Sequence, residues 1–318
     1  MDLKHSETVP ESATLLSPDI EQRLMKFIEK KDFKKGLLAL DLDGTALIED
    51  RGKISIPQSV GSGVKAIHAL KQPVVLNTLR FPLSVIWTVG EAWYKIVEQP
   101  ILTVLLNGSV LGYIKRRGVT LEYEELAAYP LTNEDLGVMI DGISELIRGG
   151  IQDILLFFYS QDWRAGETLW TPNPAKVSDL RLKYRSASKV HSGSVEELRG
   201  CLAATSIYMA SLQIDRPEDT LMAYQHSKRS SFFTKKGVDK ASGLREIAKK
   251  FDLSLPDSLG AGDTEMDTFL SEVGLALVVG PAKLDYKGHF DTLRIKHPTE
   301  LGQCIGRFAQ LAGQKEKP

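Results

Sequence analysis

Two acidic residues lie one residue apart, directly after a short apolar run. Asp41 and Asp43 follow residues 37–40, which read LLAL. Side chains two apart in an extended chain point the same way, so both carboxylates would leave the end of a strand together. Such a pair repels itself unless a cation lies between the two groups or one keeps its proton. Because Mg2+ binds carboxylate oxygens together with water and substrate phosphate, the spacing indicates a metal or proton-transfer site.

Polar residues that could act on a phosphate group follow other apolar runs. Thr78 ends the run at 73–78, where its hydroxyl could donate to a phosphate oxygen. Lys240 begins a predicted helix, which is an unfavourable place for a cation unless an anion binds nearby. Asp263 and Asp267 lie in GDTEMD, where a predicted strand passes into a predicted helix, and residues four apart share one helix face. These residues extend the possible site to a metal with a bound anion.

The segments that carry these residues alternate between strand and helix patterns. Short, continuous apolar runs predict buried strands at 37–40, 73–78, 101–106, 258–261 and 275–279. Longer segments predict helices at 18–30, 55–70, 83–97 and 239–251, with a further helix beginning at 264. This alternation predicts an α/β fold, a doubly wound, Rossmann-like parallel sheet with helices on both faces. Ligands of such sheets bind beyond the carboxyl ends of the strands.

The middle third of the chain interrupts this alternation. Residues 133–147 and 194–202 have helical patterns, whereas 151–159, 167–171 and 206–214 read as strands. This segment is long enough for a small core of its own. We therefore predict a core domain over 36–112 and 228–318, an inserted α+β cap domain over 113–227, and an N-terminal extension with a helix over 1–35.

Composition excludes few functions but favours some. Apolar residues make up 42% of the chain and charged residues 25%, and the net charge is -1, so bulk charge predicts no nucleic-acid or membrane partner. The two cysteines, Cys201 and Cys304, lack metal-ligand spacing and fit a reducing compartment. The N-terminal segment has no apolar signal core, and no run approaches the roughly 20 apolar residues of a membrane span. We expect a cytoplasmic protein, and the sequence does not indicate an oligomeric state.

Four motifs occur in an order that resembles a known superfamily. They are DLDGT at 41–45, NTLR around Thr78, VDKA around Lys240, and GDTEMD at 262–267. Together they resemble the haloacid dehalogenase-like hydrolase superfamily. The long segment between the second and third motifs resembles the large cap of its Cof-like and sucrose-phosphate phosphatase branch. Asn107-Gly108 also resembles the Asn-Gly pair that closes the third strand in that branch.

The resemblance implies a role for each motif residue. Asp41 would be the nucleophile that takes the phosphoryl group, and Asp43 the general acid and base. Thr78 and Lys240 would hold the phosphoryl oxygens. The implied cofactor is Mg2+, held by Asp41, the Asp43 carbonyl and Asp263, with Asp267 supporting either the metal or Lys240. Further contacts to the substrate are expected from Gly44, Thr45, Arg80, Asn107 and Gly108.

These roles predict a Mg2+-dependent phosphatase that acts through an aspartyl phosphate. We expect its partner to be a small phosphorylated metabolite, in particular a sugar phosphate, because a cap of this size would cover such a molecule. Trp163, Arg164 and Trp170 are cap residues that could bind it or could pack between cap and core. Two alternatives stay open. One is a phosphate-binding or regulatory protein with attenuated turnover, favoured by Leu79 and Met266 in place of the usual Gly and Asn; the other is a phosphomutase.

Overall fold

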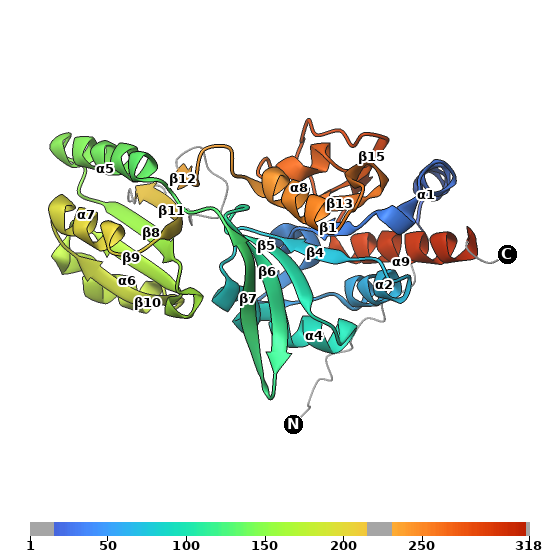
Figure 1. The fold of residues 1–318 in the computed structure, drawn as a ribbon, viewed down its shortest axis with the longest axis horizontal. Coiled ribbons are helices and arrows are strands. Elements are labelled where there is room, and N and C mark those ends of the chain that lie inside the picture. The colour runs from blue at the N-terminus through green and yellow to red at the C-terminus, as the bar shows by residue number, and fades with distance from the viewer. Residues whose placement is uncertain (1–15, 215–230, 316–318) are drawn as a thin grey trace, which may run out of the picture.

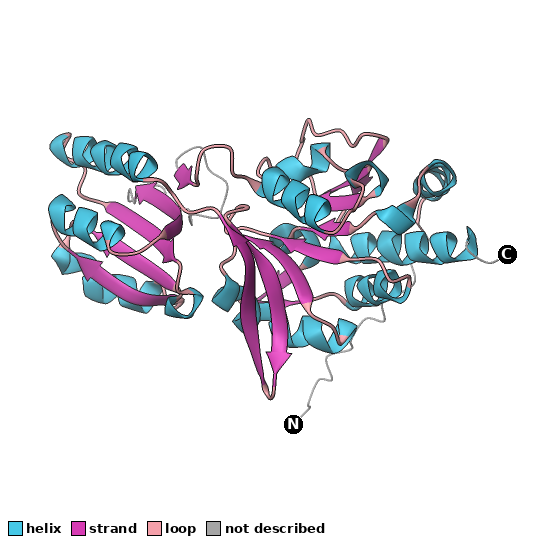
Figure 2. Cartoon of the chain, in the orientation of Figure 1, coloured by secondary structure: helices cyan, strands magenta, loops and turns pink. Residues whose placement is uncertain are grey.

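The chain folds into a core and a cap, which lie side by side (Figure 1). The computed structural model describes residues 16–214 and 231–315. The core is built on an eight-stranded sheet with the order β15-β14-β13-β1-β4-β5-β6-β7, and the cap on a five-stranded sheet with the order β10-β9-β8-β11-β12. Figure 2 shows helices packed around both sheets. The predicted α/β core with an inserted α+β cap is confirmed.

Six strands of the core sheet are parallel, as the apolar runs predict. They are β1 (Leu38–Leu40), β4 (Val74–Asn77), β5 (Ile101–Leu105), β13 (Leu259–Gly262), β14 (Leu275–Val279) and β15 (Asp291–Ile295). The first five are buried along their whole length. Continuous apolar sequence is expected there because helices cover both faces of a parallel sheet.

Helices on the two faces complete the core. One face packs against α1 (Pro18–Lys30), α2 (Gln58–Ala69), α4 (Glu91–Val97) and α9 (Pro298–Lys315). The other face packs against α8 (Lys240–Lys250). The helix predicted at 83–97 begins as α3 (Pro82–Val85) and reaches α4 through a wider helical turn at Ile86–Gly90. No helix in the described residues is both long and apolar enough to span a membrane.

The N-terminal helix α1 belongs to the core. Its Phe27 is fully buried, with its ring 6.0 Å from that of Phe308 in α9. Arg23 donates to Asp291 of β15 through Nε at 2.7 Å. The predicted N-terminal extension is therefore a structural part of the core from α1 onward. Residues 1–15 lie outside the described residues.

The boundary between core and cap lies later than the sequence predicts. Strands β6 (Val110–Arg117) and β7 (Thr120–Ala128) form an antiparallel hairpin that continues the core sheet beyond β5. The predicted boundary at 112/113 falls inside β6 and is wrong. A hairpin on the edge of a parallel sheet alternates in polarity like any half-exposed strand pair, so its sequence does not tell which sheet it joins. The predicted return at 227/228 lies outside the described residues, but the strand that follows it, β12 (Ser231–Phe233), still pairs with β11 in the cap sheet.

The cap is a sheet with helices on both faces. Its elements are α5 (Asn133–Arg148), β8 (Ile154–Ser160), β9 (Glu167–Thr171), α6 (Val177–Lys183), β10 (Ala187–Ser192), α7 (Val195–Ala203), β11 (Ile207–Ile214) and β12 (Ser231–Phe233). Helices α5 and α7 pack on one face, around the buried Trp170 and Ile143. Helix α6 packs on part of the other face, around Leu169 and Tyr184. The rest of that second face turns toward the core.

The helix predicted from residue 264 does not form. Residues 264–267 make a turn, and a single short 3-10 helix follows at Thr268–Ser271. The carboxylate of Asp267 accepts hydrogen bonds from the backbone N–H groups of Asp263 and Thr264, at 2.8 and 2.9 Å. The Asp267 side chain therefore stabilises the turn through these hydrogen bonds, and it does not share a helix face with Asp263.

Candidate active site

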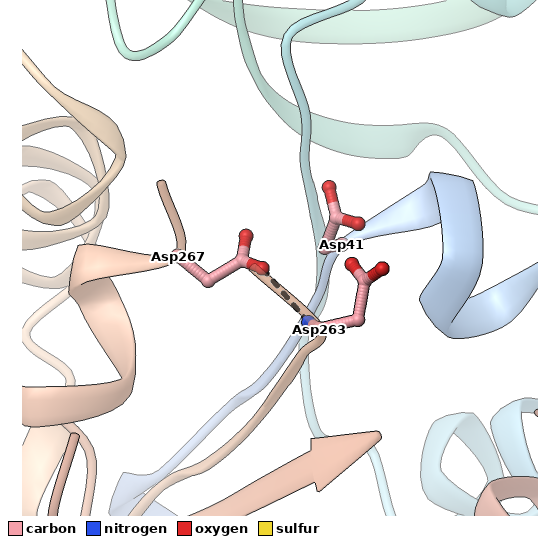
Figure 3. A group of neighbouring side chains, drawn as sticks. All are labelled: Asp41, Asp263 and Asp267. Carbon is pink, nitrogen blue, oxygen red and sulfur yellow. Dashed lines mark hydrogen bonds between the residues drawn. The ribbon is translucent and has the colours of Figure 1, made fainter. Parts of the chain in front are cut away.

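Two neighbouring strands bring the acidic residues of the motifs together. Asp41 follows β1 and Asp263 follows β13, and these strands pair in parallel. One carboxyl oxygen from each of Asp41, Asp263 and Asp267 lies within 4.8 Å of the other two (Figure 3). The predicted gathering of acids at one edge of the sheet is present in the structure.

Lys240 lies between two of these carboxylates. Its Nζ donates to Oδ1 of Asp41 and to Oδ1 of Asp267, both at 2.6 Å. All three side chains are almost fully buried. Burial by itself lowers the pKa of Lys240, but Asp267 and Asp41 outweigh it and raise that pKa, so the ammonium group keeps its charge. The Lys240 carbonyl accepts from Nδ2 of Asn77 at 3.0 Å, which fixes the start of α8 against β4.

Asp267 is a positioning residue on this geometry. One of its oxygens accepts from Lys240, and the other accepts from the Asp263 and Thr264 amides and from the Thr264 hydroxyl. Both oxygens therefore hold protein groups in place. Of the two supporting roles expected for Asp267, the contact with Lys240 is the one seen.

Gly44 and Thr45 contact the carboxylate of Asp263 and hold it in position. Gly44 has φ +78, and a Cβ at this position would lie 2.1 Å from Oδ2 of Asp263. Only glycine combines this backbone conformation with so close an approach. The Thr45 hydroxyl donates to Oδ1 of Asp263 at 3.0 Å. The turn after β1 thus holds the carboxylate that directly follows β13. This role differs from the substrate contact expected of these two residues.

The acidic cluster fits a hard divalent cation. Burial raises the pKa of Asp41 well above its usual range, with nearby Asp267 and Asp263 adding to the effect and Lys240 opposing it. Burial and Asp267 raise the pKa of Asp263 to about 6. One lysine leaves this group of carboxylates incompletely neutralised, and oxygen ligands suit Mg2+. Asp41 and Asp263 would hold such an ion, because Asp267 already uses both of its oxygens to accept from protein groups.

Asp43 is held apart from this group by Arg80. The guanidinium donates through Nε and Nη2 to the two oxygens of Asp43, at 2.7 and 2.6 Å. Its Nη1 donates to the hydroxyls of Ser84 and Thr88. The Asp43 side chain stays 55% exposed. Such a two-pronged pair sets the direction of the carboxylate as well as its charge.

A cavity of about 390 Å3 joins these residues to the cap. Its core-side lining includes Asp41, Asp43, Thr78, Arg80 and Lys240, all of which the sequence assigned to the site. Gly44, Thr45, Asn107 and Gly108 are not among the residues that line it. The cap contributes Tyr159, Glu167, Ser186, Met209, Ser211 and Phe232.

Asn107 and Gly108 lie in the turn after β5, outside the lining of the cavity. Gly108 has φ +91, and a Cβ there would lie 2.1 Å from the carbonyl oxygen of Asp239. Asp239 caps α8 by accepting from the Ser242 amide at 2.7 Å. The turn after β5 therefore packs against the start of the helix that carries Lys240. Its contribution is to place Lys240, since neither turn residue reaches the cavity.

The cap residues singled out in the sequence have packing roles. Trp170 is 1% exposed and lies in the cluster between the cap sheet and α5. The Arg164 guanidinium lies 4.3 Å from the Trp163 ring centroid and 3.6 Å from Glu122 of β7. Trp163 in turn contacts Tyr123 edge to face. Of the two alternatives, packing is the one that the geometry favours.

Sequence reasoning missed the polar residues on the cavity face of the cap. Tyr159, Glu167 and Ser211 lie on β8, β9 and β11, within runs that read as strands. Their sequence offers one local indication, which is a polar residue within an otherwise apolar strand. That signal does not tell which face points toward Asp41, because a register shift between Ile207 and Met209 changes the alternation of β11.

Comparison with known proteins gives structural matches only. No protein-family model and no curated protein sequence matches the chain. A subclass IIB sugar phosphatase of the haloacid dehalogenase-like (HAD) superfamily has a TM-score of 0.61 and 18% identity, over 86% of this chain and 98% of that one. A HAD phosphatase from Bacteroides thetaiotaomicron has a TM-score of 0.59 and 17% identity, over 96% of this chain and 99% of that one.

A HAD/Cof-like hydrolase from Plasmodium vivax has a TM-score of 0.66 and 17% identity, over 92% of this chain and 100% of that one. These matches cover 86–96% of this chain, so they include both core and cap. The chain therefore has the fold of the Cof-like branch of the haloacid dehalogenase-like superfamily, which confirms at the level of fold the resemblance drawn from its four motifs.

Proposed function

We propose that the protein is a Mg2+-dependent phosphatase that hydrolyses a small phosphorylated metabolite through an aspartyl phosphate. The observation that carries this proposal is the contact of Lys240 with Asp41 at 2.6 Å, beside Asp263 and at the floor of one cavity. A carboxylate nucleophile needs its charge and that of the phosphate balanced, and a fixed ammonium group supplies part of that balance.

In the first step, the Asp41 carboxylate attacks phosphorus. A bond forms between its oxygen and phosphorus while the bond to the alcohol oxygen breaks, and Asp43 gives its proton to that oxygen. Lys240 and the Thr78 hydroxyl hold the equatorial oxygens. Asp43 and Asp41 line the same cavity, which is what this division of roles requires.

In the second step, water attacks the phosphorus of the aspartyl phosphate. Asp43 takes a proton from the water, and the bond between phosphorus and the Asp41 oxygen breaks, which frees phosphate and restores both carboxyls. Mg2+, held by Asp41 and Asp263 with the Asp43 carbonyl, would supply further charge neutralisation on the transferred group.

The cavity supports a substrate of modest size. At about 390 Å3, with the cap as its far wall, it fits a sugar phosphate and excludes a folded phosphoprotein. The similarity to a sugar phosphatase adds a precedent for such a substrate on this fold.

Phosphate release from p-nitrophenyl phosphate and from a set of phosphorylated metabolites tests the proposal. We expect activity that EDTA abolishes and Mg2+ restores, and a loss of at least about a thousandfold in kcat in Asp41→Asn. Asp179→Asn, on the exposed face of α6, is the matched control and should keep full activity. Tight binding of phosphorylated metabolites with no turnover by the wild type would favour a binding protein instead.

A further inference from the structure

The cap turns a polar surface toward the catalytic residues. Alternate residues of a strand face opposite ways. Along β8, Phe158 lies in the cluster beneath α5, so its neighbour Tyr159 faces the other way. Glu167 lies on the same face as Tyr159, with which it pairs in register. Both residues line the cavity that also contains Asp41.

Glu167 is a buried carboxylate without a cationic partner among the described residues. Glu167 is only 5% exposed to solvent. One oxygen accepts from the Tyr159 hydroxyl at 2.5 Å, and the other accepts from the Ser186 hydroxyl at 3.1 Å. Each carboxylate oxygen can accept a further hydrogen bond. A buried carboxylate held only by hydroxyls is costly, and a donor supplied by a ligand would offset that cost.

Ser211 presents a second unfilled hydrogen-bonding group on the same wall. It is 2% exposed, and its Oγ has no hydrogen-bond partner within the described residues. Buried polar atoms nearly always have a partner, so this one calls for a reason. Met209, two residues earlier on β11, and Phe232 of β12 line the cavity beside it and offer apolar contact.

We propose that Glu167 and Ser211 form the subsite for the alcohol part of the substrate, and that they bind hydrogen-bond donors on it. The proposal rests on the proposed phosphatase function, because it takes the phosphoryl end of the substrate to lie at Asp41. Hydroxyl groups and an ammonium group are two sources of the same chemistry. Met209 and Phe232 would contact the C–H groups of the substrate. Tyr159 and Ser186 are positioning residues that orient Glu167.

Three phosphates of similar shape test this subsite. Glucose 6-phosphate carries hydroxyls, glucosamine 6-phosphate adds an ammonium group, and cyclohexylmethyl phosphate has a bare ring. We expect kcat/KM of the wild type to be at least about tenfold higher for either sugar phosphate than for the bare ring. In Glu167→Gln this ratio should fall roughly tenfold or more, mainly through the two sugar phosphates. In Ser211→Ala it should fall by a smaller factor.

Controls separate binding from folding. Glu196→Gln, on the exposed face of α7, should leave the ratio as in the wild type. A larger loss for glucosamine 6-phosphate than for glucose 6-phosphate in Glu167→Gln would identify an ammonium ligand, and equal losses would identify hydroxyls. A wild-type ratio near one overturns the proposal. So do equal losses on all three phosphates together with a lower Tm, because a structural role would affect them alike.

Calorimetry with the same three phosphates distinguishes failure of the subsite from failure of the proposed function. The ratio of dissociation constants measures the subsite without turnover. Absence of phosphate release from all three compounds, with the expected ratio in binding, would contradict the phosphatase function and support the subsite. Turnover of all three without discrimination would do the reverse.

Discussion

The floor of the cavity and its cap wall both bury charged or polar groups, but they satisfy them differently. On the core side, the Lys240 ammonium is shared by Asp41 and Asp267, and Asp267 accepts four hydrogen bonds from the protein. On the cap side, and within residues 16–214 and 231–315, Glu167 is held by hydroxyls alone and Ser211 Oγ has no partner. Under the proposed function, the core wall would bind the phosphoryl group, which all substrates share. The cap wall would bind the alcohol part, which differs from one substrate to another.

This difference predicts how substitutions divide between the two walls. Changes on the core wall should lower turnover of every phosphate ester. Changes on the cavity face of the cap should alter the choice among esters, because that face meets only the alcohol part.

Replacing Lys240 should have the largest effect. Lys240→Met keeps the length of the side chain but leaves Asp41 and Asp267 as buried, unbalanced carboxylates. We expect kcat to fall roughly a hundredfold to a thousandfold for sugar and p-nitrophenyl phosphates alike. The Tm should fall as well, because removing the ammonium group leaves the two carboxylates buried without a compensating charge. Lys189→Met, exposed on β10, is the control and should change neither quantity. Selective loss with one ester would contradict the division.

The two acids of the GDTEMD motif should separate in their response to Mg2+. Asp263→Asn removes a proposed metal ligand, so its activity, reduced about tenfold to a hundredfold at low Mg2+, should recover in part as Mg2+ is raised. Asp267→Asn weakens the hold on Lys240 and on the turn at 263–264, and added Mg2+ should not restore it. Titration of activity with Mg2+ measures both. Recovery of the two variants at the same Mg2+ concentration would show that Asp267 is a ligand too.

Replacing Gly44 should weaken Mg2+ binding in addition to lowering the stability of the fold. Gly44→Ala places a Cβ 2.1 Å from Oδ2 of Asp263, whereas Gly52→Ala, at a nearly identical φ of +77, meets nothing within 4 Å. Both substitutions should cost about 1 kcal/mol of stability for backbone strain. Gly44→Ala alone should weaken Mg2+ binding about tenfold, because it displaces Asp263, a proposed ligand. Thermal unfolding and a Mg2+ titration separate the two costs, and equal Mg2+ constants in both variants would refute the positioning role.

The smallest effect should come from Arg164. Arg164→Ala removes a contact with Glu122 at the seam between cap and core, and the guanidinium is largely exposed. Exposed ion pairs contribute little, so kcat/KM for sugar and p-nitrophenyl phosphates should change less than about twofold. A selective loss for sugar phosphates would restore Arg164 to the substrate site.

The pH dependence of Mg2+ binding bears on the core wall as well. Because Asp263 has a pKa raised to about 6, its carboxyl binds a proton below that value and is ionised above it. Protons then compete with the metal, and the apparent Mg2+ constant should weaken as the pH falls through about 6. In Asp263→Asn this component should disappear. Mg2+ titrations at pH 5 and pH 7.5 measure it.

The motif residues and the parallel strands before them could be predicted from the sequence alone. A strand buried on both faces must be apolar throughout, so the ends of β1, β4 and β13 stand out where polar residues begin. Parallel order then places Asp41, Thr78 and Asp263 at one edge. These inferences use residues next to one another in the chain, where composition and local geometry agree.

The groups that those residues contact depend on how distant segments of the chain pack together. Lys240 meets Asp41 across 199 positions of sequence, and Gly108 is glycine because α8 packs against it. The same holds for the hairpin β6–β7, which joins the core sheet, and for Trp170 and Glu167, which lie on opposite faces of β9. Each outcome depends on which surfaces pack together, and packing is a property of pairs of distant segments that no local pattern records.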